Sequence, residues 1–327
     1  MENVQIKPTV LVTGGSGFLG VYTVLQLLQQ GYEVRTTLRS LEKKESIIKA
    51  LEEGGISDFS HLSFFEADLT RDDNWNEAVK DCDYVLHVAS PFPAQDPKDE
   101  NELIIPARDG ALRVLKASRD AGVKRVVLTS SFAAVGYSIN KENHVFTEDD
   151  WTDVNTELPA YIKSKTVAEK AAWDFIEKEG NGLELSVINP VGIFGPVLGG
   201  ITSASLDIAI TGILNGNMEY TPTFTMGIVD VRDVADIHIK AMLSPEAAGE
   251  RFIATADGVM SFYDVAELFI KERPQYTTNI KKLEPIGKEF YKEMSNEKAK
   301  IILHWNPRSR EEALLASADS LMEDSQI

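Results

Sequence analysis

Two copies of a Tyr-x-x-x-Lys pattern, Tyr161…Lys165 and Tyr137…Lys141, occur in this chain of 327 residues. In a helix, residues four apart share one face, so the pattern joins a phenol to an ammonium only where the segment is helical. Tyr161 leads into 167–172 (VAEKAA), which has strong helix propensity, whereas Tyr137 lies in a segment with Gly and Asn. We therefore predict that Tyr161 and Lys165 are the reactive pair and that Tyr137 is a pocket-wall or structural residue.

Such a pair suits proton transfer at a carbonyl group. A free tyrosine, with a pKa of about 10, exchanges protons poorly at neutral pH, and a neighbouring ammonium favours its phenolate form. Tyr161 would thereby donate a proton to a carbonyl oxygen as a hydride reaches the carbon. Ser131 follows a predicted strand at 125–130 and is placed to donate to the same oxygen. Thr129 and Ser130 share this strand end.

The run TGGSGFLG, residues 13–20, offers a site for the hydride carrier, because it joins an apolar strand-like segment to a helix-like one. In its GxxGxxG spacing the first glycine permits a tight turn, the second lets the backbone approach a pyrophosphate, and the third lets the helix pack on the strand. The amino end of the helix then faces the phosphates. A Gly-rich structural turn is the alternative interpretation. The residues predicted to bind the cofactor here are Thr13, Gly14, Gly15, Ser16, Gly17, Phe18, Leu19 and Gly20.

The end of the second predicted strand, 33–38, indicates which nicotinamide dinucleotide is bound. It is followed by Arg39 and by Lys43, with no carboxylate at the strand end where NAD sites usually have one. An arginine can hold a 2′-phosphate with two hydrogen bonds, so we predict NADP(H) as the cofactor. The alternative for Arg39 is a solvated loop position. Asp68, after the third predicted strand, either accepts from the adenine amino group or caps a turn or helix.

The elements that must position these residues alternate in type as far as residue 130. Strands are predicted at 9–13, 33–38, 62–67, 83–88 and 125–130, and helices at 18–30, 42–53, 75–80 and 101–121. Alternation of this kind predicts a Rossmann-type α/β fold, a doubly wound parallel sheet with helices on both faces and right-handed crossovers. Ligands bind such sheets at the carboxyl ends of the strands.

The second half of the chain is less regular. We predict a loop at 132–157, a helix from Pro159 to about Lys178 and a strand at 183–188. Beyond these lies a stretch rich in Gly and Pro. The expected domains are a dinucleotide-binding domain at 1–189, which carries the catalytic residues, and a smaller, mainly substrate-binding lobe at 190–327. Some segments of that lobe are expected to return to the first domain.

Composition narrows the classes of partner. The formal net charge of −18 disfavours nucleic acids and anionic membrane surfaces, which need clustered Lys and Arg. The single cysteine, Cys82, fits a reducing compartment. The polar start and the lack of a spanning apolar run lead us to expect a cytoplasmic protein without a membrane partner. No two of the five histidines have metal-ligand spacing, so no metal is expected.

Together the segments TGGSGFLG (13–20), VLTSS (127–131) and YIKSK (161–165) resemble those of the extended short-chain dehydrogenase/reductase superfamily. RTTLR (35–39) and VLHVASP (85–91) more narrowly resemble the dihydroflavonol reductase-like branch. That branch includes cinnamoyl-CoA reductases and microbial aldehyde and ketone reductases. The chain end, WNPRSREEA, is similar to that of bacterial members.

This resemblance implies NADPH-dependent reduction of an aldehyde or ketone. It assigns Tyr161 as the acid/base, Lys165 as its partner and Ser131 as the group that polarises the carbonyl. It implies that Val88, Ala89 and Ser90 line the cofactor groove and that Pro190, Val191, Ile193 and Ser205 flank the nicotinamide. Leu69 and Thr129 are further residues predicted to bind the cofactor. One departure concerns the long fourth helix, where many extended members carry Asn and this chain has Arg108-Asp109-Gly110. A proton relay through that Asn is therefore in doubt.

Several positions keep two interpretations. Phe92 and Phe132 form either an apolar substrate wall or part of the aromatic core. Cys82 and His87 are expected to be structural, and Arg232 is expected to pair with its acidic neighbours at the hinge between the lobes.

Two other functions compete with the reductase. A nucleotide-sugar epimerase or dehydratase with bound NAD is disfavoured by the second strand end and by HVASP. An NADPH-sensing protein without turnover is disfavoured by the three intact catalytic residues. The chain is expected to be a monomer or a homodimer that acts on a small molecule.

Overall fold

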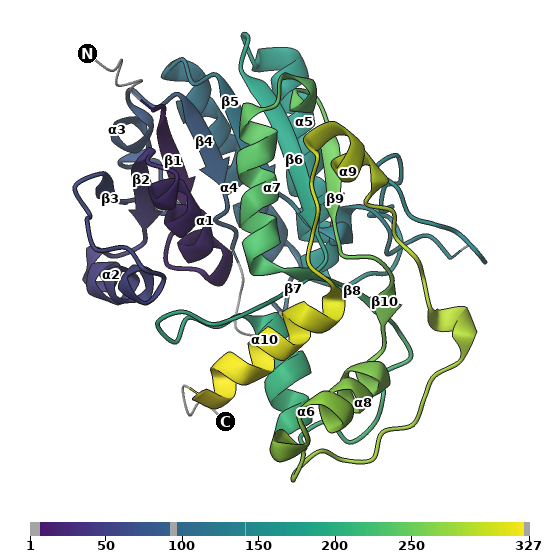
Figure 1. Ribbon diagram of the computed structural model, residues 1–327. Coiled ribbons are helices and arrows are strands. Elements are labelled where there is room, and N and C mark those ends of the chain that lie inside the picture. The colour runs from purple at the N-terminus through teal and green to yellow at the C-terminus, as the bar shows by residue number, and fades with distance from the viewer. Residues whose placement is uncertain (1–6, 92–96, 141, 324–327) are drawn as a thin grey trace.

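Seven short strands form one parallel sheet, in the order β3-β2-β1-β4-β5-β6-β9. The computed structural model describes residues 7–91, 97–140 and 142–323 (Figure 1). The strands of this sheet are β1 (Thr9–Thr13), β2 (Glu33–Leu38), β3 (Leu62–Glu66), β4 (Tyr84–His87), β5 (Arg125–Thr129), β6 (Glu184–Pro190) and β9 (Arg251–Ala254). Because β1 lies between β2 and β4, the crossovers on its two sides run in opposite directions. Such a switch point is where open α/β sheets bind ligands.

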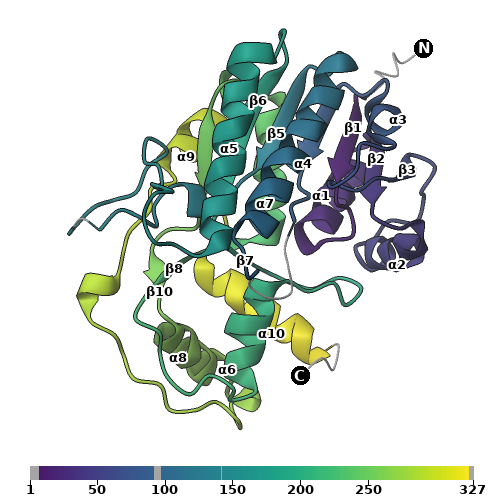
Figure 2. The ribbon, with the colours of Figure 1, turned by 180° about the vertical axis from the view of Figure 1, so that it is seen from behind.

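Helices cover both faces of this sheet. They are α1 (Phe18–Gln29), α2 (Lys44–Glu53), α3 (Trp75–Val79), α4 (Asn101–Asp120), α5 (Ala160–Glu179) and α7 (Val231–Leu243). α1 packs on α7 over one face (Figure 1), and α4 packs along α5 over the other (Figure 2). Covered faces require apolar strands, and Val10, Leu11 and Val12 of β1 are fully buried. The predicted Rossmann-type, doubly wound sheet is confirmed.

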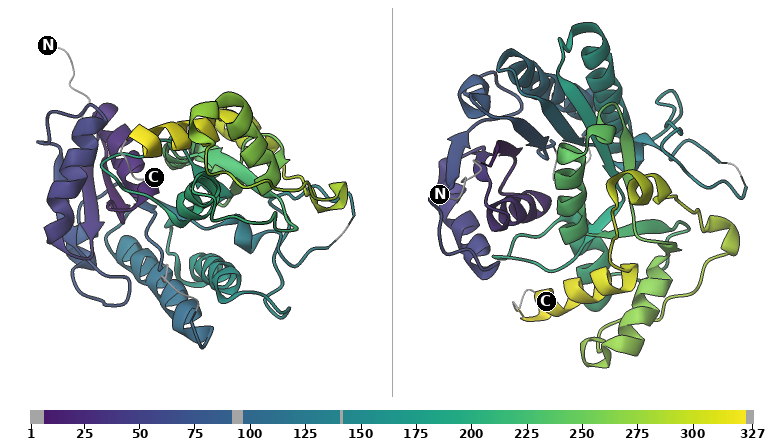
Figure 3. Two further views of the ribbon diagram at one scale, coloured as in Figure 1. Left: turned by 90° about the horizontal axis from the view of Figure 1, so that it is seen from below. Right: turned by 45° about the horizontal axis from the view of Figure 1, so that its top comes forward.

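A smaller lobe lies beyond the carboxyl ends of the strands (Figure 3). It contains a three-stranded sheet, β10-β8-β7, in which β8 pairs parallel with β7 and antiparallel with β10. Its elements are β7 (Gly192–Phe194), a π-helical turn (Leu206–Thr211), α6 (Gly212–Leu214), β8 (Met226–Asp230), β10 (Val259–Met260) and α8 (Phe262–Glu272). α9 (Glu297–Leu303) and α10 (Arg310–Glu323) follow.

Two elements from the chain after residue 190 belong to the large layer. β9 pairs in parallel with the end of β6, and α7 lies against α1. The sequence patterns defined neither element. The other differences are local, since β6 runs on to Pro190 and a 3-10 turn, Leu41–Lys43, precedes α2.

Cys82 is buried in the cluster formed by α3, α4 and the central strands. Burial raises the pKa of its thiol to about 11, which is the behaviour of an inert core cysteine. In the part of the chain that the structure describes, no helix combines the length and the apolar character needed to cross a membrane.

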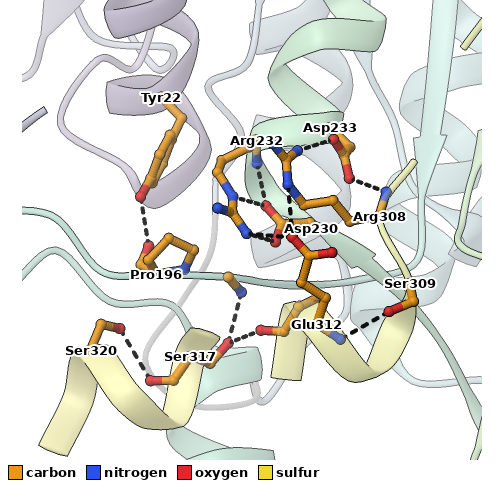
Figure 4. Close-up of polar contacts among 12 residues, drawn as sticks. Tyr22, Pro196, Asp230, Arg232, Asp233, Arg308, Ser309, Glu312, Ser317 and Ser320 are labelled. Atoms are coloured by element: carbon orange, nitrogen blue, oxygen red, sulfur yellow. Dashed lines mark hydrogen bonds and ion pairs between the residues drawn. The ribbon is translucent and has the colours of Figure 1, made fainter. Parts of the chain in front are cut away.

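A network of charged and hydroxyl groups joins the two lobes (Figure 4). Asp230, at the end of β8, is fully buried and accepts from Nε and Nη2 of Arg232 at 2.9 and 2.7 Å. The same carboxylate caps α7 by accepting from the backbone N–H of Arg232. The predicted pairing of Arg232 with an acidic neighbour is confirmed. One carboxylate therefore both starts α7 and neutralises the cation beside it.

The last helix and the first helix complete this junction. Ser317 of α10 accepts from the backbone N–H of Gly195 at 2.7 Å, and Ser320 accepts from that of Val197 at 2.9 Å. On the other side, the hydroxyl of Tyr22 in α1 donates to the carbonyl of Pro196 at 2.9 Å. The segment at 195–197 is thus bonded to α1 on one side and to α10 on the other (Figure 4).

We expect Asp230→Ala to lower the free energy of unfolding by about 2–4 kcal/mol, because it leaves the guanidinium of Arg232 with only the longer pair to Glu312, at 3.8 Å, among the described residues and removes a helix cap. Urea unfolding measures this loss. Asp174→Ala is the control, because it breaks an exposed pair with Lys178 and should cost less than about 0.5 kcal/mol. Equal losses in the two variants would contradict the importance of the buried pair.

Candidate active site

The first turns of α5 carry the pair that the sequence singled out. Because α5 begins at Ala160, Tyr161 lies in its first turn and Lys165 in its second. The Nζ atom of Lys165 is 5.7 Å from the centroid of the Tyr161 ring. Tyr137 lies in an irregular turn instead, and Lys141 lies outside the described residues. Of the two Tyr-x-x-x-Lys copies, the one at 161–165 is held by a helix.

Ser131 begins the 3-10 turn Phe132–Ala134 that follows β5. Its Oγ accepts from the backbone N–H of Ala133 at 3.1 Å, and a hydroxyl that accepts in this way keeps its own O–H as a donor. Each of the two neighbouring hydroxyls has a different partner. Ser130 donates to the buried Glu169 at 2.5 Å, and Thr129 contacts His238 at 2.7 Å. In these contacts, the hydroxyls of Thr129 and Ser130 donate to protein groups, whereas that of Ser131 accepts.

The tautomer of His238 gives the direction of the contact with Thr129. Nδ1 of His238 lies 2.7 Å from the carbonyl oxygen of Val234, which can only accept. Nδ1 therefore carries the hydrogen, and Nε2 accepts from the hydroxyl of Thr129. Burial lowers the pKa of His238 to about 4, so the ring is neutral at physiological pH.

Lys165 also contacts the segment that follows β4. Its Nζ donates to Oγ of Ser90 at 2.7 Å. Both residues line a small pocket between α4 and α5, together with Leu69, His87, Ala89, Pro91, Ala107, Ala111, Leu128, Thr129, Ser130, Ala168 and Glu169. Four residues predicted to bind the cofactor, Leu69, Ala89, Ser90 and Thr129, are thus brought to the same place as Lys165.

His87 connects this pocket to the glycine-rich loop. Burial, and secondarily the charge of Lys165, lowers the pKa of His87 to about 3. The hydroxyl of Thr13 accepts from the N–H of Ala89 at 3.0 Å and lies 2.8 Å from Nδ1 of His87. Thr13 and the neutral ring of His87 therefore share a hydrogen bond. Thr13 and His87 are both buried and act as structural supports of the loop, as expected of His87.

The loop after β1 has the shape that a pyrophosphate needs. A Cβ added at Gly15 would lie 2.1 Å from Oγ1 of Thr36, and one at Gly20 would lie 2.1 Å from the carbonyl oxygen of Gly14. At Gly17 the nearest atom would be 3.5 Å away, and this residue is exposed. α1 has no side-chain cap and no acidic residue in its first turn. Its amino end can therefore donate backbone N–H groups to an anion, and the residues present fit a dinucleotide.

Arg39 and Asp68 lie at neighbouring strand ends. Arg39 is exposed directly after β2, and Lys43 is exposed in the 3-10 turn that follows. Asp68 accepts from the N–H and the hydroxyl of Thr70, both at 2.8 Å. These bonds, with a smaller contribution from Arg39, lower the pKa of Asp68. The geometry agrees with the turn-capping interpretation of Asp68.

The remaining predicted residues lie toward the smaller lobe. Pro190 ends β6. Val191, between β6 and β7, and Ile193, within β7, are partly buried, and Ser205 precedes the π-helical turn. Phe132 is buried against Phe146 and Tyr137, with ring centroids 5.3 and 5.8 Å away, which agrees with its role in the aromatic core. Val88 packs against the main core cluster. Phe92 lies outside the described residues.

The departure in the long fourth helix has a clear structural counterpart. Asp109 pairs with Arg108 at 2.7 Å, and Gly110 packs closely against Leu69. Within the described residues, the part of the pocket that α4 lines is formed by Ala107 and Ala111. Polar groups reach this pocket from the strands and from α5 instead. Glu169 was not among the predicted site residues, although its spacing of four residues from Lys165 places it on the same helix face.

Residues 10–254 match the model of the NAD dependent epimerase/dehydratase family. The chain belongs to this family. The curated members similar to it include the putative NADPH-dependent methylglyoxal reductase GRP2 of Candida albicans, 35% identical over 90% of this chain and 93% of that protein. Dihydroflavonol 4-reductase of Hordeum vulgare is 34% identical over 83% of this chain and 76% of that protein.

Among solved structures, the fold of this chain is similar to that of the yeast methylglyoxal/isovaleraldehyde reductase Gre2 complexed with NADPH. The TM-score is 0.83 at 29% identity, over 98% of this chain and all of the other. The resemblance to the dihydroflavonol reductase-like branch of the extended short-chain dehydrogenases/reductases is confirmed. The glycine loop and the helix that carries Tyr161 both fall within the matched part of this family's fold.

The buried histidine at 238 predicts a pH dependence of stability. Its pKa in the folded state, about 4, lies below the ordinary value near 6.5, so the unfolded chain binds a proton between these values that the folded chain does not. Stability must therefore fall as the pH is lowered from about 6.5 to about 4. In His238→Gln, we expect the slope of unfolding free energy against pH in this window to decrease by up to about 1.4 kcal/mol per pH unit.

Denaturant unfolding at a series of pH values measures this slope. His61→Gln is the control, because the pKa of the exposed His61 is raised by Glu33 and the ring is protonated in both states below its ordinary pKa. The control should keep the slope of the unmodified protein between pH 4 and 6. A slope unchanged in His238→Gln would mean that this histidine is protonated in the folded state.

Proposed function

We propose that this chain is an NADPH-dependent reductase that transfers a hydride to the carbonyl carbon of a small aldehyde or ketone. The observation that carries the proposal is the placement of Lys165, which lies beside the ring of Tyr161 and donates to Ser90 at the end of β4. The hydroxyl of Ser131 lies at the end of the next strand, β5. These positions support a site in which a phenol, an ammonium and a hydroxyl donor act together at the carboxyl edge of the sheet, near the glycine loop.

Each of these groups has one task in the reaction. NADPH, when bound, supplies the hydride. Tyr161 donates its phenolic proton to the carbonyl oxygen, and Lys165 stabilises the phenolate that remains. Ser131 donates a hydrogen bond to the same oxygen and stabilises its developing negative charge. The product is an alcohol, and the reverse direction uses the phenolate as the base.

The cofactor assignment rests on two observations. The exposed Arg39 and Lys43 follow β2 at the position where a 2′-phosphate would lie, and the uncapped amino end of α1 suits a pyrophosphate. Relatives named as NADPH-dependent, or solved with NADPH, support the same choice. Neither observation favours an epimerase that retains NAD, and the two curated relatives described above are both named as reductases.

The substrate contacts lie toward the smaller lobe. We propose that Val191 and Ile193, together with Tyr137 on the turn after β5, form apolar walls around the carbonyl group. Tyr137 is 54% exposed, and the partial desolvation of its phenol, with the neighbouring phenol of Tyr161, raises its pKa, so the group stays neutral. We propose that the protein acts in the cytoplasm, as a monomer or a homodimer. We further propose that its substrate binds between a dinucleotide-binding domain at 1–189 and a smaller lobe at 190–327.

Tyr161→Phe tests the acid/base role. We expect kcat for carbonyl reduction to fall about 100- to 10,000-fold, because the variant lacks the proton donor, while NADPH binding is retained. NADPH consumption with a panel of aldehydes, ketones and β-keto esters measures kcat, and cofactor fluorescence measures binding. Tyr137→Phe removes the same atom from the competing copy of the pattern and should keep most of its turnover. Comparable turnover in Tyr161→Phe and the unmodified protein would refute the assignment.

Arg39→Asp tests the phosphate site. We expect kcat/KM with NADPH to fall about 10- to 100-fold, because charge-assisted hydrogen bonds to the 2′-phosphate are lost and a like charge faces it. The value with NADH should change little or rise. Lys49→Asp makes the same change of charge on the outer side of α2, 73% exposed, and should leave the preference intact. If both variants keep the original ratio of NADPH to NADH activity, Arg39 does not bind the phosphate.

A further inference from the structure

Glu169 is a buried carboxylate one helical turn after Lys165. Its side chain is fully inaccessible to solvent. It accepts from Oγ of Ser130 at 2.5 Å, from Nδ2 of Asn189 at 2.7 Å and from Nε of Arg251 at 2.6 Å. These donors come from the end of β5, from β6 and from β9, three adjacent strands of the sheet. One side chain of α5 is thereby bonded to three strands at once.

Two of these donors adjoin the residues that carry the proposed chemistry. Ser130 immediately precedes Ser131, and Nδ2 of Asn189 also donates to the backbone carbonyl of Ser131 at 3.2 Å. The carboxylate itself is on the same helix as Lys165. The contacts of Glu169 therefore fix the distance between the helix that holds the phenol and ammonium and the turn that holds the serine hydroxyl.

Arg251 extends the same network to the segment before α5. Its side chain is 8% exposed, its Nη1 donates to the carbonyls of Glu148 and Asp150, and its guanidinium lies 3.7 Å from the ring centroid of Trp151. The carboxylate of Glu148 accepts in turn from the N–H of Ile253 in β9. The chain that leads from the serine turn into α5 is thus held by the arginine that pairs with Glu169.

The energetics of this network favour a geometric role. A buried ion pair stabilises a fold little more than apolar side chains of the same volume, because both charges lose their hydration. Among the described residues, Oδ1 of Asn189 and Nη2 of Arg251 are buried without a hydrogen-bond partner, which adds a further cost. The network instead fixes the orientation of α5, because each hydrogen bond restricts the angle and the distance between this helix and a strand.

We propose that Glu169, paired with Arg251, is a positioning residue that sets the placement of Tyr161 and Lys165 relative to Ser131. The inference rests on the acid/base roles proposed above. A glutamine at this position has the same size, but its NH2 group cannot accept from Ser130, Asn189 or Arg251. At least one donor then loses its partner, and α5 must shift relative to the ends of β5 and β6.

Glu169→Gln tests this role. Its control is a second Glu–Arg pair that joins β5 and β6, two of the strands that Glu169 contacts. Glu184, the first residue of β6, pairs with the buried Arg125, the first residue of β5, at 2.6 Å. Glu184→Gln therefore removes the same charge from an arginine at the opposite, amino end of the sheet. Both variants should lose thermal stability, and Glu169→Gln alone should lose activity.

We expect kcat for carbonyl reduction to fall at least about tenfold in Glu169→Gln, because a displacement of about 1 Å can reduce a rate on the order of 100-fold. NADPH binding should stay near that of the unmodified protein. The rise of alcohol oxidation with pH should move to higher pH, because an ammonium that lies farther from Tyr161 favours its phenolate less. Glu184→Gln should keep both kcat and the pH profile at temperatures where it is folded.

The double variant Glu169→Gln/Arg251→Gln separates positioning from stability. It removes the unpaired cation, so its Tm should recover toward that of the unmodified protein, while kcat should stay low. Recovery of kcat together with Tm would overturn the proposal, as would an unchanged kcat and pH profile in Glu169→Gln. If Glu169→Gln does not fold, Ser130→Ala, which removes one donor, takes its place, and full kcat in it would equally overturn the proposal. Near-normal turnover in Tyr161→Phe would instead refute the proposed function, so the two failures can be told apart.

Discussion

Parallel pairing of seven strands is the constraint on which the rest of this structure depends. Since every strand runs the same way, all seven carboxyl ends fall on one edge, and each connection must cross the sheet through a helix or a long segment. The glycine loop, the end of β4, the serine turn and the connection to the smaller lobe consequently lie side by side, although they are separated by up to 180 residues in the sequence. The site is assembled by the direction of the strands before any side chain contributes to it.

Buried polar groups then fix how the helices sit on these strand ends. Thr13 with His87 ties the glycine loop to β4, Thr129 with His238 ties β5 to α7, and Glu169 with Arg251 ties α5 to β5, β6 and β9. The first two contacts depend on neutral imidazoles, which burial maintains, and the third depends on opposite charges that compensate each other. Apolar packing on the two faces holds the layers together without specifying direction. The hydrogen bonds, by contrast, restrict the distances and angles between the helices and the strand ends.

Local patterns were sufficient to predict what depends on neighbouring residues. Apolar runs such as TVLVT, the spacing of the glycines and the helix propensity after Tyr161 each act within about ten residues, and the elements that they predict are present. The elements missed depend on distant partners. β9 has four residues and pairs with a strand that ends about 60 residues earlier, and α7 is placed by α1. The donors to Glu169, at 130, 189 and 251, become neighbours only when the sheet has formed, so spacing along the chain carries no signal of them.

The junction between the lobes depends on α10, which follows all the strands of both sheets in the sequence. Ser317 and Ser320 of α10 hold the backbone at 195–197, while Asp233 in α7 accepts from the backbone and the guanidinium of Arg308. During synthesis the first six strands of the sheet leave the ribosome long before these residues do. The nucleotide-binding layer can therefore begin to fold cotranslationally, whereas the junction closes only after α10 has emerged. The junction between the lobes therefore forms after this layer has begun to fold.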